Sequence, residues 1–284
     1  GFTFFHGFLG DMMDDYWTHL RGGVNWMRLN KKKITPKGHA TEVFSRWAIE
    51  YMKKQVKDKT KPFFLYLAYN APHFPIQPPE DWLKKVRNRE PKLDLKRATN
   101  VAFVEHMDHE IGKVLKTVKE LGIEKDTLIT FSSDNGGSIP HAATNHPWRG
   151  GKQEHWEGGI RVPLIVKWPN KVKAGSQSDL VTGLEDWMVT IHELVGVKKP
   201  MPRNHDGISV VPTLLGKKQK PRSFLYREFS GYGGQQAVWA GKWKAIRQKM
   251  LRKGKNHDPL KIELYDLEKD ASESNDLASE NPQV

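Results

Sequence analysis

Apolar residues recur at helical spacing in the first half of the chain. The spacing predicts an amphipathic helix over residues 39–57 and a longer one over residues 96–121, with Gly122 placed to end it. A third helix is expected around residues 186–194. The first 38 residues are rich in glycine and aromatic side chains, and we expect them to form loop.

Continuous apolar runs of strand length lie between these helices. FFLYLAY at residues 63–69, DTLITF at 126–131 and VPLIVKW at 162–168 have the pattern of strands covered on both faces. Helix and buried strand therefore alternate over residues 1–199. This alternation predicts an α/β domain with a largely parallel sheet flanked by helices.

The pattern changes near residue 200. FLYREF, QAVWAGKWKAIR and IELYDL look like short antiparallel strands, with a turn at residues 240–242. The polar end of the chain is expected to finish as one helix. Residues 200–284 are therefore predicted to form a small carboxyl-terminal α+β subdomain that carries a short antiparallel sheet.

Composition limits the classes of protein that these 284 residues can form. Hydrophobic residues make up 37%, enough for a packed core, and no apolar run approaches the roughly 20 residues of a membrane-spanning helix. The absence of cysteine excludes disulfides, thiolate zinc sites and a cysteine nucleophile within this chain. The formal charge of +13 favours a polyanionic partner, although solvated basic faces are the alternative for any single cluster. The basic residues cluster at 31–33, 167–173, 217–222 and 242–255. The sequence contains no nucleic-acid-binding motif beside this charge.

One loop that follows a predicted strand offers oxygen ligands, at the strand end where open α/β sheets bind their ligands. In SDNGG, Asp134 and Asn135 present two hard oxygen atoms of the kind that calcium or magnesium prefers. Gly136 and Gly137 let the backbone turn sharply and approach a ligand closely. An ordinary Asx turn is the alternative, because Asp-Asn-Gly is also strong turn chemistry.

Two further loops hold His73 and Lys152. His73 stands between prolines in NAPHFP, and a stiff backbone suits an imidazole that acts as hydrogen-bond donor or general acid. A histidine that packs in a surface loop is the alternative. Lys152 follows a double glycine in RGGKQEHWEGG and suits an anion clamp, whereas a solvated lysine is the usual role of such a residue.

Together and in this order, the motifs resemble the sulfatase family, arylsulfatase-like enzymes of the alkaline-phosphatase-like fold. NHPWRGGKQEHWEGGIRVPLIVKWP after SDNGG is the most specific stretch. FFLYLAYNAPHFP, GFTFFHGFLG, DGISVVPTLLG and ELYDLEKDASESNDLA extend the resemblance over nearly the whole chain.

The resemblance implies hydrolysis of a sulfate ester to an alcohol and inorganic sulfate, with calcium and a formylglycine nucleophile. It implies that Asp134 and Asn135 are calcium ligands and that Lys152 contacts the sulfate. His73 would hydrogen-bond the sulfate and help to protonate the leaving oxygen. A sulfated polysaccharide is a substrate of the implied class, and a secreted or periplasmic location is typical of the family. The sequence specifies no oligomeric state.

The nucleophile motif of the family, Cys/Ser-x-Pro-x-Arg, has no match in this chain. SIPHA begins in the same way but has Ala142 in place of arginine. We therefore expect an amino-terminally truncated fragment, inactive alone, whose nucleophile and remaining metal ligands precede Gly1. Two alternatives stay open: a non-catalytic polyanion-binding protein, and a phosphodiesterase or phosphonate hydrolase of the same superfamily.

Overall fold

The computed structural model describes residues 2–202, 204–251, 258 and 260–284. The chain forms two compact units, Gly1–Glu124 with Pro140–Ala143, and Lys125–Ile139 with Thr144–Val284. This division does not coincide with the boundary near residue 200, which stays a prediction. Part of the basic cluster at residues 242–255 lies outside the described residues.

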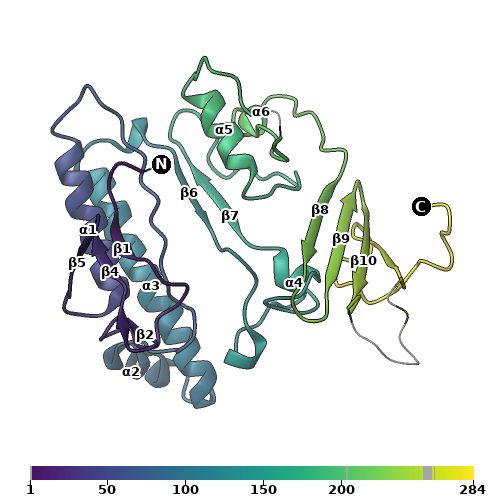
Figure 1. Ribbon diagram of the computed structural model, residues 1–284, viewed down its shortest axis with the longest axis horizontal. Helices are drawn as coiled ribbons and strands as arrows, with labels where there is room; N and C mark the ends of the chain where they lie inside the picture. Colours follow the sequence, from purple (N-terminus) through teal and green to yellow (C-terminus); the bar gives the residue numbers. More distant parts are fainter. Residues whose placement is uncertain (1, 203, 252–257, 259) are drawn as a thin grey trace. The chain divides into compact units, whose positions relative to one another are not determined.

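Three helices form the larger part of the first unit. Helices α1 (Ala40–Gln55) and α3 (Leu95–Glu120) confirm the first two predicted helices, whereas α2 (Glu80–Arg89) was not predicted. His39 and Asp94 cap α1 and α3, because each side chain accepts a backbone N–H of the first turn. Helices α1 and α3 pack side by side, as Figure 1 shows.

The first 38 residues contain short strands, so the expectation of loop alone was wrong. Strands β1 (His6–Phe8), β4 (Met27–Leu29) and β5 (Lys32–Lys33) form an antiparallel sheet, and β2 (Leu20–Arg21) pairs with β3 (Val24–Asn25). The strands bring apolar side chains of this segment against the helices, where burial stabilises them. The resulting core contains Met13, Tyr16, Met27, Ala40, Val43, Phe44, Ala71 and Phe103.

Residues 63–69 form no strand, although their apolar run predicted one. Leu67 and Tyr69 pack against the core of the first unit, while Phe64 and Tyr66 are 58% and 71% exposed. Alternate side chains therefore face inward, as in a strand. Within the described residues, however, no neighbouring strand supplies the ladder of hydrogen bonds.

In the second unit, β6 (Ile129–Ser132) and β7 (Leu164–Lys167) form at the predicted places. They pair antiparallel, with Phe131 opposite Ile165. All strand pairs in the described part of the chain are antiparallel, so the largely parallel sheet is not confirmed. Helix α5 (Asp186–Leu194) confirms the third predicted helix, and the short α6 spans Val211–Leu214.

Four antiparallel strands confirm the sheet predicted near the carboxyl terminus. Their order is β11 (Glu263–Asp266), β10 (Trp243–Gln248), β9 (Gln235–Ala240) and β8 (Leu225–Phe229). One sheet face packs against the side chain of Trp156, which comes from the RGGK loop. The predicted turn forms with Gly241 at a φ of 59°, a conformation that favours glycine.

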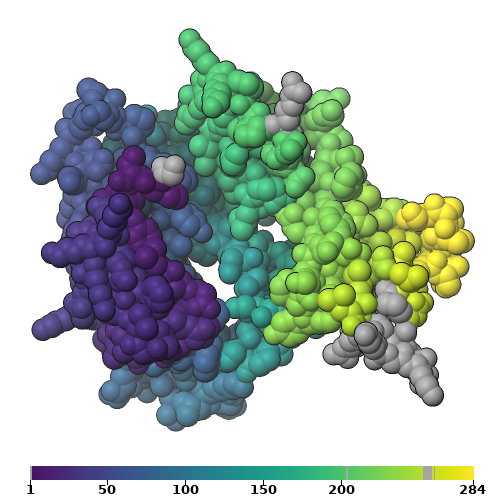
Figure 2. All heavy atoms as spheres, viewed as in Figure 1, coloured from purple at the N-terminus to yellow at the C-terminus, as the bar shows by residue number. Residues whose placement is uncertain are grey.

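The chain end after β11 forms turns, and the terminal helix predicted there is absent from the described residues. In Figure 2 this chain end is the yellow segment at the edge of the molecule. The backbone N–H of Leu277 donates to the carbonyl of Leu264, 2.8 Å away, which ties this end to β11. None of the helices in the described residues has the length and apolar character needed to cross a membrane.

Candidate active site

The predicted site residues belong to both units. Asp134 and Asn135 directly follow β6, and Lys152 lies in the loop before the short helix α4 (Glu157–Ile160), all in the second unit. His73 belongs to the first unit. The structure therefore brings three of the four predicted residues into one compact unit.

Backbone contacts join the SDNGG loop to the RGGK loop. Lys152 N–H donates to the carbonyl of Gly137 at 3.1 Å, and Gly136 N–H donates to the carbonyl of Gly159 at 2.8 Å. A Cβ added at Gly136 would lie 1.8 Å from the oxygen of Gly158, so no side chain fits there. Neither Gly136 nor Gly137 has a positive φ. These glycines allow the two loops to approach each other closely, and neither is needed for a left-handed backbone conformation.

The side chain of Asn145 forms hydrogen bonds with both loops. Its Oδ1 accepts the N–H of Gly137 at 2.8 Å, and its Nδ2 donates to the carbonyls of Gly137 at 2.9 Å and Gly150 at 3.1 Å. No motif in the sequence singles out Asn145. Only its place upstream of the double glycine could have drawn attention to it.

The oxygens of Asp134 and Asn135 fit a hard cation. Asp134 is exposed, and within the described residues no group donates a hydrogen bond to its carboxylate. Asn135 donates from Nδ2 to the carbonyl of Gly136 at 3.2 Å, which leaves Oδ1 as an acceptor. The described residues contain no cluster of three or more His, Cys, Asp or Glu that could hold a metal. Calcium takes six to eight oxygens, so this pair supplies only part of a coordination shell.

Lys152 and His73 present polar atoms that the surrounding protein leaves available. The ammonium of half-buried Lys152 forms no ion pair in the part of the chain that the structure describes. His73 Nδ1 lies 2.7 Å from the carbonyl oxygen of Phe74. Because a carbonyl can only accept, we assign the proton of the neutral ring to Nδ1, which leaves Nε2 as the second polar atom. The Tyr16 hydroxyl donates to the carbonyl of His73 at 3.1 Å and helps to hold the loop.

The RGGK loop is anchored in the sheet core. The guanidinium of Arg149 lies 3.6 Å from the ring centroid of Trp156 and donates to the carbonyl of Glu273 at 2.8 Å. Gln153 has a φ of 76°, a left-handed conformation that is strained for a residue with a side chain. The surrounding contacts therefore hold the loop in one conformation.

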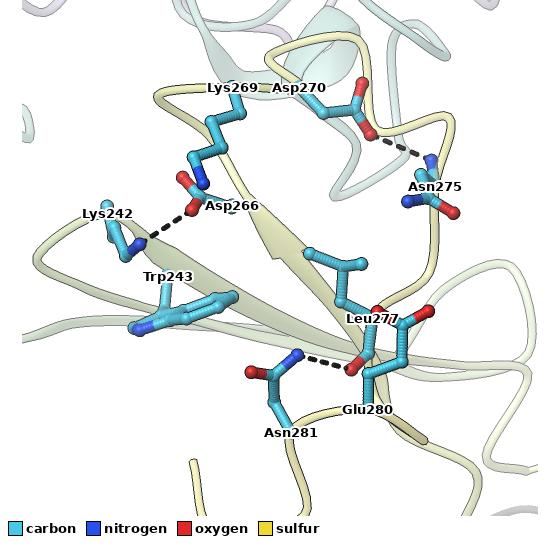
Figure 3. Close-up of a pocket in the computed structure, with 9 residues that line it drawn as sticks. All are labelled: Lys242, Trp243, Asp266, Lys269, Asp270, Asn275, Leu277, Glu280 and Asn281. Carbon is cyan, nitrogen blue, oxygen red and sulfur yellow. Dashed lines mark hydrogen bonds and ion pairs between the residues drawn. The ribbon is translucent and has the colours of Figure 1, made fainter.

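A separate pocket of about 510 Å³ lies beside β10 and β11 (Figure 3). Several of its polar groups already pair with one another: Lys242 with Asp266 at 2.8 Å, and Asp270 with the N–H of Asn275 at 2.8 Å. The predicted site residues do not line it. The lining residues are Lys242, Trp243, Asp266, Lys269, Asp270, Asn275, Leu277, Glu280 and Asn281.

A carboxylate, a carboxamide and a lysine on two loops joined by backbone hydrogen bonds suit a site for a cation together with an anionic ester group. The chain belongs to the sulfatase family. The family model described as sulfatase matches residues 1–197, and a model described as N-sulphoglucosamine sulphohydrolase, C-terminal, matches residues 145–283.

Relatives from animals and bacteria agree with this assignment. The chain is 32% identical to mouse N-acetylgalactosamine-6-sulfatase, with 76% of this chain and 40% of the relative covered. It is 30% identical to a sulfatase of Formosa agariphila, with coverage of 87% and 47%. The crystal structure of Ps i-CgsB in complex with k-i-k-neocarrahexaose matches with a TM-score of 0.87 and 28% identity, covering 100% of this chain and 64% of that one. The chain thus spans about half the length of these curated relatives.

Proposed function

We propose that the protein hydrolyses a sulfate ester to an alcohol and inorganic sulfate, with Asp134, Asn135, Lys152 and His73 in its site. The observation that carries the proposal is the joining of the SDNGG and RGGK loops. Backbone hydrogen bonds connect the loop that contains Asp134 and Asn135 to the loop that contains Lys152. Membership of the sulfatase family supports this reading.

Asp134 and Asn135 would hold calcium through the carboxylate and Oδ1. When bound, calcium supplies a fixed positive charge against the sulfate oxygens. Calcium prefers oxygen ligands, which is what the two side chains offer. Further ligands must come from other groups or water, because these two side chains fill only part of the shell.

Lys152 would bind the sulfate and offset the negative charge that develops as the ester bond breaks. Its ammonium is not engaged in an ion pair within the described residues, so its full charge is available to a substrate. His73 would donate a hydrogen bond from Nε2 in its protonated form, since Nδ1 is occupied by the carbonyl of Phe74. The same protonated Nε2 can deliver a proton to the leaving oxygen.

We propose a sulfated saccharide, such as a sulfated polysaccharide, as the substrate class. The name of the mouse relative specifies a sulfate on an amino sugar, and the Ps i-CgsB structure holds a neocarrahexaose. The formal charge of +13 supports this choice, because a positive field concentrates a polyanion near the protein. We propose further that a formylglycine outside these 284 residues is the nucleophile, and that the 284 residues alone turn over no sulfate ester.

The test uses the full-length protein, an aryl sulfate and the matched aryl phosphate, with calcium varied. Asp134→Ala is compared with Asp179→Ala, which removes an exposed carboxylate elsewhere in the second unit. The proposal expects sulfate ester turnover that depends on calcium and a raised calcium requirement in Asp134→Ala alone. Preference for the phosphate ester would favour the phosphodiesterase alternative. Equal calcium dependence of both variants would refute the assignment of Asp134.

A further inference from the structure

Three charged side chains meet in the interior of the second unit, beside the segment that follows Lys152. Lys244 Nζ lies 3.0 Å from Glu157 Oε1 and 2.5 Å from Glu273 Oε1. Glu273 Oε2 also accepts the backbone N–H of Glu157 at 2.6 Å, and the indole of Trp239 donates to Glu157 Oε1 at 3.1 Å. We call Glu157, Lys244 and Glu273 the buried triad, because their side chains are 6%, 0% and 0% exposed.

Stability alone is a poor reason for such a cluster. Each buried ion loses its hydration, and apolar residues of the same volume often give an equally stable or more stable core. Glu273 adds a local cost, since it has a φ of 55°, in the left-handed region. A costly and strained arrangement, in which Glu273 Oε1 has the ion pair with Lys244 but no hydrogen bond, suggests that the buried triad fixes a neighbouring segment in place.

The first connection from the buried triad leads to the SDNGG loop. Glu157 is followed by Gly158 and Gly159, and the carbonyl of Gly159 accepts the N–H of Gly136. The two backbone segments are in close contact, because the oxygen of Gly158 occupies the space where a Cβ of Gly136 would lie. A shift of the backbone after Glu157 must therefore move Gly136, which directly follows Asn135.

The second connection leads to the start of the RGGK loop. The carbonyl of Glu273 accepts a hydrogen bond from Arg149, whose own carbonyl accepts the N–H of Gly158 at 2.7 Å. Lys152, three residues after Arg149, is tied in turn to Gly137. Both loops of the candidate site are thus fixed by contacts that begin at the buried triad.

We propose that the buried triad positions the site: Lys244 and Glu273 set the placement of the Asp134–Asn135 pair and of Lys152 through the backbone of residues 149–159. The inference rests on the proposed function for its catalytic consequence, but the placement of the two loops can be measured independently. Lys244 and Glu273 are positioning residues that act through Glu157, Arg149 and the glycines between them.

The experiment compares Lys244→Met with Lys242→Met in the full-length protein. Lys242 is the matched control, because it also pairs with a buried carboxylate, that of Asp266, but lies beside the pocket of Figure 3. Hydrogen exchange is followed by mass spectrometry in peptides that contain residues 134–137 and 150–159. Calcium half-saturation, KM and kcat for an aryl sulfate are measured at a temperature where both variants are folded.

We expect Lys244→Met to speed exchange in both peptides and to lower kcat or calcium affinity by about 10- to 100-fold, as loss of a supporting residue behind a metal site does. Lys242→Met should change neither. Adding Glu273→Gln to Lys244→Met should recover part of the loss, because it removes the unpaired buried charge. A purely structural role would lower the melting temperature and leave exchange, calcium half-saturation and kcat of the folded protein unchanged, which would overturn the proposal.

Two further outcomes keep this inference separate from the proposed function. If the wild-type protein turns over no sulfate ester, the proposed function fails, and the exchange of residues 134–137 still decides whether the buried triad positions the loop. If Lys244→Met does not fold, Glu273→Gln alone takes its place, since the amide keeps the shape of the carboxylate. Unchanged exchange in Glu273→Gln would then overturn the inference, and faster exchange would support it.

Discussion

His155 makes the stability of the second unit depend on pH. Its side chain is 7% exposed, and its Nδ1 has no hydrogen-bond partner among the described residues. Burial, with the charges of Lys244 and Arg227 as further causes, lowers its pKa from 6.5 to about 4. The folded protein therefore keeps this imidazole neutral at pH values where the unfolded chain takes up a proton.

The sign and size of the effect follow from the two pKa values. Stability from the neutral ring is complete above pH 6.5, falls as the pH drops, and is fully lost below the folded pKa. Between pH 7.5 and pH 5 the loss is about 2 kcal/mol. Glu273 contributes in the opposite direction, because burial raises its pKa. That contribution is present with or without His155.

The assay compares the pH dependence of wild type and His155→Gln. The free energy of opening is measured by hydrogen exchange at the amides of β9 and β10, which report on the second unit. We expect the wild type to lose about 2 kcal/mol more than His155→Gln between pH 7.5 and pH 5. His146→Gln, which removes an exposed histidine from the same loop, should behave like wild type. Parallel pH profiles for wild type and His155→Gln would show that burial of His155 does not make stability depend on pH.

Four further substitutions test the packing. Gly136→Ala should destabilise the second unit by about 1 to 3 kcal/mol in urea unfolding, because its Cβ meets the Gly158 carbonyl. Gly112→Ala, whose Cβ would lie in open space on α3, should instead stabilise the first unit by about 0.5 to 1 kcal/mol. Asn145→Ala should cost about 1 to 3 kcal/mol through its three lost hydrogen bonds and speed exchange at Gly137, and unchanged exchange there would show that the clamp is unimportant. Phe103→Ala should cost about 3 to 5 kcal/mol in the first unit, and a loss below 1 kcal/mol would contradict its place in the core.

Local patterns predicted helices α1, α3 and α5 and the strands from β6 to β11, but not α2 or the short strands of the first 38 residues. The apolar spacing over residues 39–57 and 96–121 predicted the ends of α1 and α3 to within a few residues, because the apolar period and the capping residues lie in the same segment. Strand direction could not be predicted in this way. It depends on which strands become neighbours, so the antiparallel pairing of β6 with β7 and the missing ladder at residues 63–69 lay beyond local patterns.

The candidate site shows the same limit. Asp134, Asn135 and Lys152 were accessible to sequence reasoning, because loops at strand ends and double glycines have recognisable patterns. Asn145 and the buried triad were not. Lys244 lies 87 residues after Glu157 along the chain, and Glu273 lies 116 residues after it. Only the folded sheet brings them together.

The turnover of a sulfate ester by Lys152→Ala shows whether the RGGK loop belongs to a sulfatase active site. The full-length protein and the variant are compared with Lys171→Ala, which removes an exposed lysine of the same unit. We expect Lys152→Ala to lower kcat by on the order of 100- to 1,000-fold, as loss of a group that stabilises developing charge does, and Lys171→Ala to retain the kcat of the wild type. A folded Lys152→Ala protein with wild-type kcat would contradict the claim that the SDNGG and RGGK loops form part of a sulfatase active site.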